Sequence, residues 1–237
     1  MAASADDTVI VVSGGIAERE RDRLAVPPAG HVIAADSGAQ AAFELGLRVD
    51  ELIGDLDSVL AAARAWVTES GGRVTRYPEA KDATDLELAL AAAASRVPVP
   101  RRLVVLGSAE GRLDHLLGGA LLLAAPSWAG VDATRVPVIQ ARLGRATITV
   151  VRERADLAGT PGDLISLLPA GGAARGVTLS GLLYPLHDAE LLPGTTLGTS
   201  NEFAAARATV EVKEGVVLAV QPGLMGTHYL EGKGPVR

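Results

Sequence analysis

The first half of the chain alternates short, continuously apolar runs with longer segments rich in alanine and leucine. The apolar runs that we expect to form strands are 9–12, 32–35, 52–53 and 103–106, and we expect a further strand at 73–76. Apolar runs without alternation are typical of strands buried on both faces, as in a parallel sheet covered by helices. The segments that we expect to form helices are 39–45, 58–70, 84–95 and 113–124. This alternation predicts an α/β domain with an open, mostly parallel sheet flanked by helices.

The pattern changes from about Thr147 onward, where glycine and proline separate shorter apolar runs. The runs that we expect to form strands here are 147–151, 164–168, 177–179, 209–212 and 216–220. Lys213-Glu214-Gly215 predicts a hairpin turn. Several short strands at this spacing predict an antiparallel β-sandwich. We therefore place an α/β domain at residues 1–146 and a β-sandwich domain at 147–237.

Composition narrows the class of protein. A chain of 237 residues that is 48% hydrophobic can form a core in each domain. The net charge of −6 and the lack of a dense basic cluster argue against nucleic acid as a partner. The apolar runs are too short to cross a membrane, and residues 1–8 lack the features of a secretory signal. We expect a cytoplasmic protein with no membrane partner.

The absence of cysteine excludes some chemistry. With none in the chain, disulfides, thiolate metal sites and a cysteine nucleophile are ruled out. Any metal site must therefore use oxygen or nitrogen ligands.

Glycines and charged side chains follow every expected strand of the first domain. In an open α/β sheet, ligands bind beyond the carboxyl ends of the strands. In strand order, the residues found there are Gly14 and Gly15; Asp36 and Ser37; Asp55 and Asp57; Lys81, Asp82 and Asp85; and Gly107, Arg112, Asp114 and His115. Because parallel strands end at one edge, we expect these residues to converge there.

The acidic run Gly54-Asp55-Leu56-Asp57-Ser58 is the strongest signal of function in the first domain. Its two carboxylates flank a single residue between a buried strand and a helix. Two negative charges at this spacing repel each other, and a bound cation would offset that repulsion. Mg²⁺ prefers such hard oxygen ligands. We favour a metal site over the alternative that both are solvated loop residues.

Purely structural roles are open for several of the other residues. Thr84-Asp85-Leu86-Glu87 fits a helix capping box, and the helix dipole would favour Asp85 in the first turn. Asp36 or Ser37 can cap the next helix, and Gly14-Gly15 can be a tight turn. Capping leaves Lys81 and Asp82 unexplained. Taken together, the residues expected at this edge suit phosphoryl-type transfer. In such a reaction a metal and an arginine hold the phosphates while a carboxylate orients the attacking hydroxyl.

The order of these motifs resembles that of the thiamine pyrophosphokinase family. The resembling segments are Ala35-Asp36-Ser37-Gly38-Ala39, Ile53-Gly54-Asp55-Leu56-Asp57-Ser58, Lys81-Asp82-Ala83-Thr84-Asp85-Leu86-Glu87, Gly111-Arg112-Leu113-Asp114-His115, Gly181-Leu182-Leu183-Tyr184-Pro185-Leu186 and Ser200-Asn201-Glu202-Phe203. The family patterns that they match are Ala-Asp-Gly-Gly-Ala, Gly-Asp-Phe-Asp-Ser, Lys-Asp-x-Thr-Asp-x-Glu, Gly-Gly-Arg-x-Asp-His, Gly-Leu-x-Tyr-Pro-Leu and Ser-Asn-Glu-Phe. The resemblance extends over almost the whole chain.

The resemblance implies an enzyme that transfers the pyrophosphoryl group of ATP to the hydroxyl of thiamine and releases AMP. It implies Mg²⁺, a catalytic ATP-binding domain at 1–146, a thiamine-binding domain at 147–237, and a homodimer with active sites at the subunit junction. The implied catalytic residues are Asp55, Asp57, Asp82 and Asp85, with Asp55, Asp57 and Asp85 holding the metal. The implied ATP-binding residues are Gly14, Gly15, Asp36, Ser37, Lys81, Gly107, Arg112, Asp114 and His115. The implied thiamine-binding residues are Asp85, Thr199, Ser200 and Asn201, of which Ser200 and Asn201 come from the partner subunit.

Three residues depart from the family patterns. Ser37 replaces a glycine, Leu56 stands where phenylalanine is usual, and Glu110 replaces the first glycine before Gly111-Arg112. A carboxylate at Glu110 would repel phosphate unless it points away from the loop.

Three alternative functions stay open at this stage. One is a pyrophosphokinase for another hydroxyalkyl heterocycle, since a fold does not fix the acceptor. A second is a metal-dependent phosphatase of the haloacid-dehalogenase kind, although its Asp-x-Asp loop normally follows the first strand and here follows the third. A third is a non-catalytic regulator that binds thiamine or a nucleotide.

Overall fold

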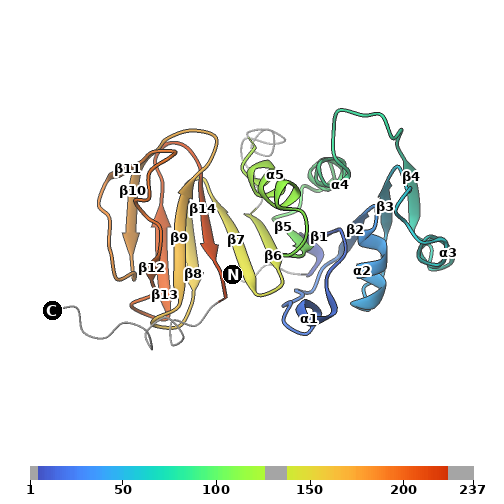
Figure 1. The fold of residues 1–237 in the computed structure, drawn as a ribbon, viewed down its shortest axis with the longest axis horizontal. Helices are drawn as coiled ribbons and strands as arrows, with labels where there is room; N and C mark the ends of the chain where they lie inside the picture. The colour runs from blue at the N-terminus through green and yellow to red at the C-terminus, as the bar shows by residue number, and fades with distance from the viewer. Residues whose placement is uncertain (1–4, 126–137, 224–237) are drawn as a thin grey trace. The chain divides into compact units, whose positions relative to one another are not determined.

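The computed structural model describes residues 5–125 and 138–223, and the chain divides into two compact units, Met1–Gly144 and Arg145–Arg237. Figure 1 shows that the first unit contains both helices and strands, whereas the second is built from strands. Each unit packs a cluster of buried apolar side chains of its own. The fold class expected from the sequence is confirmed.

Six parallel strands form the sheet of the first unit. They are β1 (Thr8–Ser13), β2 (His31–Ala35), β3 (Glu51–Gly54), β4 (Arg73–Arg76), β5 (Arg102–Gly107) and β6 (Val138–Leu143). Their order in space is β6-β5-β1-β2-β3-β4. The sequence pattern did not predict β6, because Gln140 and Arg142 interrupt its apolar residues. Within this parallel sheet, Gln140 accepts a hydrogen bond of 2.5 Å from Arg102 of β5.

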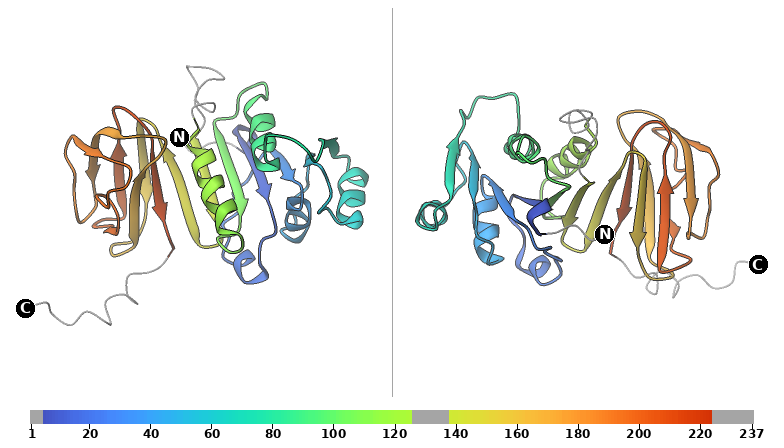
Figure 2. Two further views of the ribbon diagram at one scale, coloured as in Figure 1. Left: turned by 45° about the horizontal axis from the view of Figure 1, so that its top comes forward. Right: turned by 180° about the vertical axis from the view of Figure 1, so that it is seen from behind.

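Helices cover both faces of this sheet. The longer ones are α2 (Gly38–Glu44), α3 (Ala61–Glu69), α4 (Asp85–Ala94) and α5 (Leu113–Leu123), and they confirm the four predicted helices with small shifts at their ends. Figure 2 shows α4 and α5 on the opposite face from α2. Two short elements were not predicted, the 3-10 turn η1 (Ala5–Asp7) and the helix α1 (Glu18–Arg21). Among the described residues, no helix combines the length and the apolar character that a membrane span requires.

Two antiparallel four-stranded sheets form the second unit, with orders β12-β9-β14-β7 and β11-β10-β13-β8. Their strands are β7 (Ala146–Val151), β8 (Arg154–Ala158), β9 (Leu164–Pro169), β10 (Ala174–Ser180), β11 (Ala189–Leu191), β12 (Asn201–Glu202), β13 (Arg207–Glu211) and β14 (Val217–Gln221). Apolar side chains from both sheets meet in one core, which includes Ile165, Val177 and Phe203.

The hairpin turn predicted at Lys213-Glu214-Gly215 is wrong. This segment leads from β13 to β14, which belong to different sheets. The main chain of Arg175 donates a hydrogen bond to Glu214 and accepts one from Lys213, at 2.8 and 3.0 Å. The segment therefore pairs with the start of β10 and carries the chain across to the other sheet.

Candidate active site

The carboxyl ends of β1 to β5 meet at one edge of the parallel sheet. The turn after β2 is held there by its main chain, since the Asp36 amide donates a 2.8 Å hydrogen bond to the carbonyl of Ile53. Gly38 lets the start of α2 approach β1 closely, because a Cβ atom at this position would lie 2.1 Å from the carbonyl oxygen of Val12. These contacts fix Asp36 beside the end of β3.

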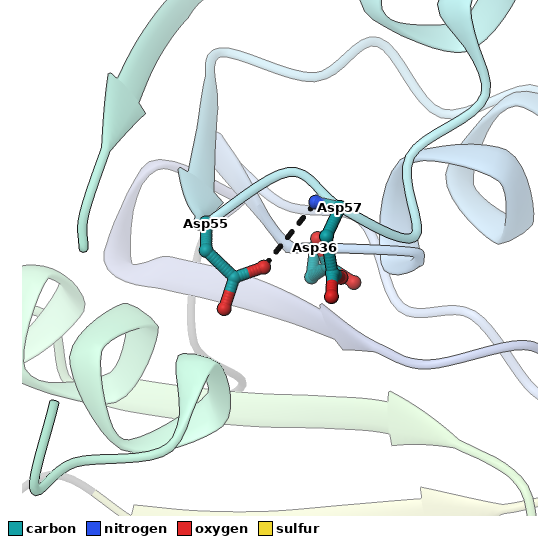
Figure 3. Close-up of side chains that lie close together, drawn as sticks. All are labelled: Asp36, Asp55 and Asp57. Atoms are coloured by element: carbon teal, nitrogen blue, oxygen red, sulfur yellow. Dashed lines mark hydrogen bonds between the residues drawn. The ribbon is translucent and has the colours of Figure 1, made fainter. Parts of the chain in front are cut away.

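Three carboxylates gather at this edge. Ligand oxygens of Asp36, Asp55 and Asp57 all lie within 4.8 Å of one another (Figure 3). The amide of Asp57 donates a 3.2 Å hydrogen bond to Oδ1 of Asp55. Leu56, between them, has a φ of 68°, in the left-handed region that non-glycine residues seldom occupy. This turn brings the two carboxylates to the same side of the chain, and we call the three residues the aspartate cluster.

The electrostatics of the aspartate cluster suit a cation. Oδ1 of Asp36 is buried and has no hydrogen-bond partner among the described residues. Burial raises the pKa of Asp36, and the neighbouring carboxylates raise it further, although the Ser37 amide acts in the opposite direction. An unpaired buried carboxylate oxygen is costly. A divalent metal ion bound by the three carboxylates would compensate that cost, and its preference for oxygen ligands matches the donors present.

Lys81 lies between the aspartate cluster and Asp85. Its Nζ is 2.7 Å from Oδ2 of Asp55 and 3.2 Å from Oδ1 of Asp85. The hydrogen bond from Lys81 holds the pKa of Asp55 below its usual range, and the same bond raises the pKa of Lys81. The group of three contains Asp36 and not Asp85, so Asp85 as a metal ligand stays a prediction.

The capping interpretation of residues 84–87 is confirmed. Thr84 occupies the N-cap of α4, and its hydroxyl accepts a 3.2 Å hydrogen bond from the Glu87 amide. Asp85 accordingly lies in the first turn. A Cβ atom at Gly54 would lie 3.1 Å from Cβ of Asp36 and 3.3 Å from Oδ1 of Asp85. The glycine that precedes Asp55 therefore lets two carboxylates approach the end of β3.

A pocket of about 370 Å³ opens beside the aspartate cluster. It is lined by Asp55, Asp57, Arg76, Tyr77, Pro78 and Glu79. The last four residues were missed by sequence reasoning, which passed from the predicted strand 73–76 directly to Lys81, Asp82 and Asp85. The available signal was their position at and directly after the predicted strand 73–76; in the structure Arg76 pairs with Gly54 across β3 and β4. The Tyr77 amide continues this pairing with a 2.9 Å hydrogen bond to the Gly54 carbonyl.

The predicted glycines of the edge differ in their surroundings. A Cβ atom at Gly14 or Gly15 would have no described atom within 4 Å, so this loop leaves room for a ligand. Gly107 is buried, and a Cβ atom there would lie 3.2 Å from the Leu143 side chain. Gly107 therefore packs at the end of β5 and leaves no space for a ligand at this position. Asp82 is exposed and lies outside the aspartate cluster.

The segment that starts α5 carries an ion pair. Nη2 of Arg112 lies 2.6 Å from Oδ2 of Asp114, and both side chains are exposed. The hydrogen bond from Arg112 lowers the pKa of Asp114 to about 2. Arg112 occupies the N-cap position of the helix without capping it by its side chain, and His115 is exposed in the first turn. The guanidinium is therefore presented at the sheet edge with Asp114 as its anchor.

Two family models match this chain, one for each unit of the structure. The model "Thiamin pyrophosphokinase, catalytic domain" matches residues 25–131, and the model "Thiamin pyrophosphokinase, vitamin B1 binding domain" matches residues 146–217. Together they cover well over half of the chain. The chain belongs to the thiamine pyrophosphokinase family.

Individual relatives agree with this assignment. A thiamine pyrophosphokinase of Bacillus subtilis (strain 168) is 28% identical over 199 residues, which are 80% of this chain and 86% of that protein. A crystal structure of thiamine pyrophosphokinase from Bacillus subtilis aligns with a TM-score of 0.73 at 26% identity, over 90% of this chain and 98% of the other. The corresponding enzyme structure from Geobacillus thermodenitrificans gives a TM-score of 0.70 at 26% identity, over 90% and 96%.

Glu110 departs from the thiamine pyrophosphokinase pattern, and the structure shows how its charge is handled. Oε2 of Glu110 lies 2.5 Å from Nη2 of Arg19, and Oε1 accepts a 2.8 Å hydrogen bond from Nε. The hydrogen bond from Arg19 lowers the pKa of Glu110. The carboxylate is therefore paired and held by α1, which reduces the repulsion of phosphate expected from the sequence.

Three of the four predicted thiamine-binding residues, Thr199, Ser200 and Asn201, lie in the second unit, at and before β12, whereas Asp85 begins α4 in the first unit. Asn201 is buried, and its carboxamide donates to the Tyr184 carbonyl at 2.7 Å and accepts from the Tyr184 amide at 3.0 Å. Thr199 and Ser200 are exposed, and Ser200 has a φ of 56°. Asn201 thus fixes the loop around Tyr184, whereas Thr199 and Ser200 offer their hydroxyl groups at the surface.

Proposed function

We propose that this protein is a thiamine diphosphokinase that transfers the pyrophosphoryl group of ATP to the hydroxyl of thiamine, giving thiamine diphosphate and AMP. The observation that carries the proposal is the aspartate cluster, with Lys81 and Asp85 beside it, in a chain of this family. We place the reaction in the cytoplasm. Neither a membrane nor a nucleic acid takes part in it.

Asp36, Asp55 and Asp57 would hold Mg²⁺. When bound, the metal ion supplies positive charge to the phosphate oxygens of the transition state. Asp36 suits this role because its buried Oδ1 has no other described partner. Asp55 and Asp57 suit it because the turn at Leu56 points both toward the same space. This ligand set replaces the predicted one, in which Asp85 took the third place.

Asp85 is then available to the acceptor. The hydroxyl oxygen of thiamine forms a bond to the β-phosphorus of ATP, and the bond from that phosphorus to the α–β bridging oxygen breaks. AMP leaves with the bridging oxygen, and the hydroxyl proton passes to Asp85. Lys81, 3.2 Å from Asp85, orients this carboxylate and offers its charge to the transferred phosphates. Asp82 is exposed, and we give it no direct role beyond its contribution to the electrostatic field around the site.

The glycines and cations of the edge suit the nucleotide. Gly14 and Gly15 provide open backbone after β1, and Gly111 provides it before α5. Arg112 would pair with phosphate oxygens, for which its planar guanidinium is well shaped. Asp114 holds that guanidinium in place. His115, Asp36 and Ser37 border the same edge of the sheet. Gly107 is buried at the end of β5 and shapes the loop that follows it.

Thiamine would bind to the exposed Thr199 and Ser200 of the partner subunit, positioned by Asn201. This assignment requires a homodimer. Three leucines of α5, Leu113, Leu117 and Leu121, support one, because their side chains are 66%, 56% and 60% exposed and share one helix face. A contiguous exposed apolar strip of this kind marks an interaction surface.

Replacing both Leu117 and Leu121 by aspartate is expected to produce a monomer. Charged groups cannot be buried unpaired in an apolar interface without a cost of several kcal/mol. Light scattering coupled to size-exclusion chromatography measures the mass. Leu60→Asp, at a residue 63% exposed that precedes α3, serves as the control and should stay dimeric. A variant of α5 that keeps the dimer mass would contradict this surface.

The deciding experiment for the proposed function is an acceptor panel with detection of AMP. Purified protein, ATP and Mg²⁺ are incubated with thiamine, with other hydroxyalkyl heterocycles, or with no acceptor. We expect equal amounts of AMP and thiamine diphosphate with thiamine. Release of inorganic phosphate without AMP would indicate the phosphatase. Turnover of another acceptor alone would indicate the related pyrophosphokinase, and binding without turnover would indicate the regulator.

A further inference from the structure

The short helix α1 carries two side chains that reach the loop after β5. Arg19 pairs with Glu110, and Glu20 contacts Ser108 and Ala109. These residues are separated by about ninety positions in the sequence. The loop that they hold leads directly into Gly111 and Arg112, on the proposed nucleotide side of the site.

Of the two side chains, Glu20 is the more buried and makes the larger number of hydrogen bonds to loop residues 108 and 109. It is only 7% exposed. Its Oε2 accepts a 2.5 Å hydrogen bond from the Ser108 hydroxyl, and its Oε1 accepts a 3.1 Å bond from the Ala109 amide. The Ser108 hydroxyl oxygen in turn accepts a 2.9 Å bond from the Glu110 amide. One buried carboxylate therefore organises three successive residues of the loop.

The surroundings of Glu20 are shaped for its carboxylate. Gly144 has a φ of 57°, and a Cβ atom there would lie 2.6 Å from Oε1 of Glu20. A side chain at position 144 would displace the carboxylate from the loop. Burial of a charged carboxylate is costly unless hydrogen bonds compensate it, and here the donors come from the loop. The contacts thus stabilise one conformation of residues 108–110.

We propose that Glu20 is a positioning residue for nucleotide binding, an inference that rests on the proposed function. The helix that carries it follows Gly14-Gly15 by only a few residues, so Glu20 joins the loop after β1 to the loop after β5. Both loops border the proposed phosphate site. Fixing them before ATP binds reduces the conformational entropy that binding would otherwise cost.

Steady-state kinetics of Glu20→Ala tests the proposal. The KM for ATP should rise about tenfold, because the two hydrogen bonds that the carboxylate accepts from the loop are lost, while the KM for thiamine is unchanged. Glu20→Gln keeps an acceptor for the Ala109 amide and should recover part of the affinity. Ser108→Ala removes one of these two bonds from the loop side, and should raise the KM for ATP about threefold.

A matched control lies next to α1. Glu44 pairs with Arg21 of the same short helix at 3.3 Å, away from residues 108–110, so Glu44→Ala should leave both KM values unchanged. Calorimetry with a non-hydrolysable ATP analogue measures nucleotide affinity independently of turnover. If Glu20→Ala fails to fold, Ser108→Ala decides the question, because this variant keeps the buried carboxyl group of Glu20 in place.

The outcomes separate this inference from the proposed function. Unchanged analogue affinity in Ser108→Ala and in the folded Glu20 variants, or an equal rise of both KM values, would overturn the positioning role alone. Wild-type protein that binds the analogue but forms no AMP from ATP and thiamine would overturn the proposed function alone. A selective loss of analogue affinity that Glu20→Gln partly restores would support the positioning role in either case.

Discussion

Asp57→Asn is expected to lower kcat at least about 1000-fold while the protein stays folded, since about 4 kcal/mol of transition-state stabilisation is lost with one metal ligand. Asp57 is exposed, and its carboxylate accepts a hydrogen bond from the Ser58 hydroxyl at 2.8 Å. An asparagine can accept the same bond. The substitution therefore removes negative charge from the aspartate cluster with little change in packing.

Asp57 gives a cleaner test than Asp55, because replacing Asp55 would also leave Lys81 without its nearest partner. Turnover is measured as AMP formed over a range of Mg²⁺ concentrations, and folding by urea denaturation. Asp188→Asn provides the control, since Asp188 is an exposed aspartate of the second unit that pairs with Lys213. Full activity of Asp57→Asn at low Mg²⁺ would contradict the assignment of Asp57 as a metal ligand.

Gly38→Ala is expected to lower the free energy of unfolding by about 3 kcal/mol, near the upper end of typical overpacking costs. The added methyl group would lie 2.1 Å from the Val12 carbonyl oxygen and 2.8 Å from its carbon, both main-chain atoms of a central strand. Relief requires α2 to move away from β1. Since Asp36 sits directly before this helix, activity should fall with stability.

Gly118→Ala is the matched comparison. Gly118 lies in α5, is exposed, and has no described atom within 4 Å of a Cβ position. Alanine there should stabilise the protein by up to about 1 kcal/mol, since glycine is a poor helix former. Urea denaturation of both variants measures the difference. Equal stability of Gly38→Ala and wild type would show that the close approach of α2 is not needed.

Local patterns were sufficient to predict most of the first unit. Strands buried on both faces leave continuous apolar runs, so β1, β2, β3 and β5 could be recognised from sequence. The edge strand β12 is only two residues long, and β6 contains Gln140 and Arg142, so neither leaves such a run. The connection at residues 213–215 has the composition of a hairpin, and only the pairing of β13 and β14 with different sheets shows that it is none.

The candidate site could be predicted only as far as strand order allows. Asp36 and Asp55 follow different strands, and their proximity depends on β2 and β3 being neighbours. The place of Asp36 in the aspartate cluster depends on the main-chain hydrogen bond from its amide to the Ile53 carbonyl, which no sequence pattern shows. The contacts of Arg19 and Glu20 with the loop after β5 cross about ninety residues of sequence, and no motif records them.

The ammonium group of Lys81 has a consequence for the protein before it meets any metal. Several carboxylates close together repel one another and oppose folding of the site until a cation is bound. Newly made chains would then need the metal ion in order to fold. Here the chain carries its own counter-charge, 2.7 Å from one carboxylate and 3.2 Å from another. If the protein binds the proposed metal ion, we expect folding and metal binding to be separate events: a chelator should leave an inactive but folded protein, and added metal should restore turnover.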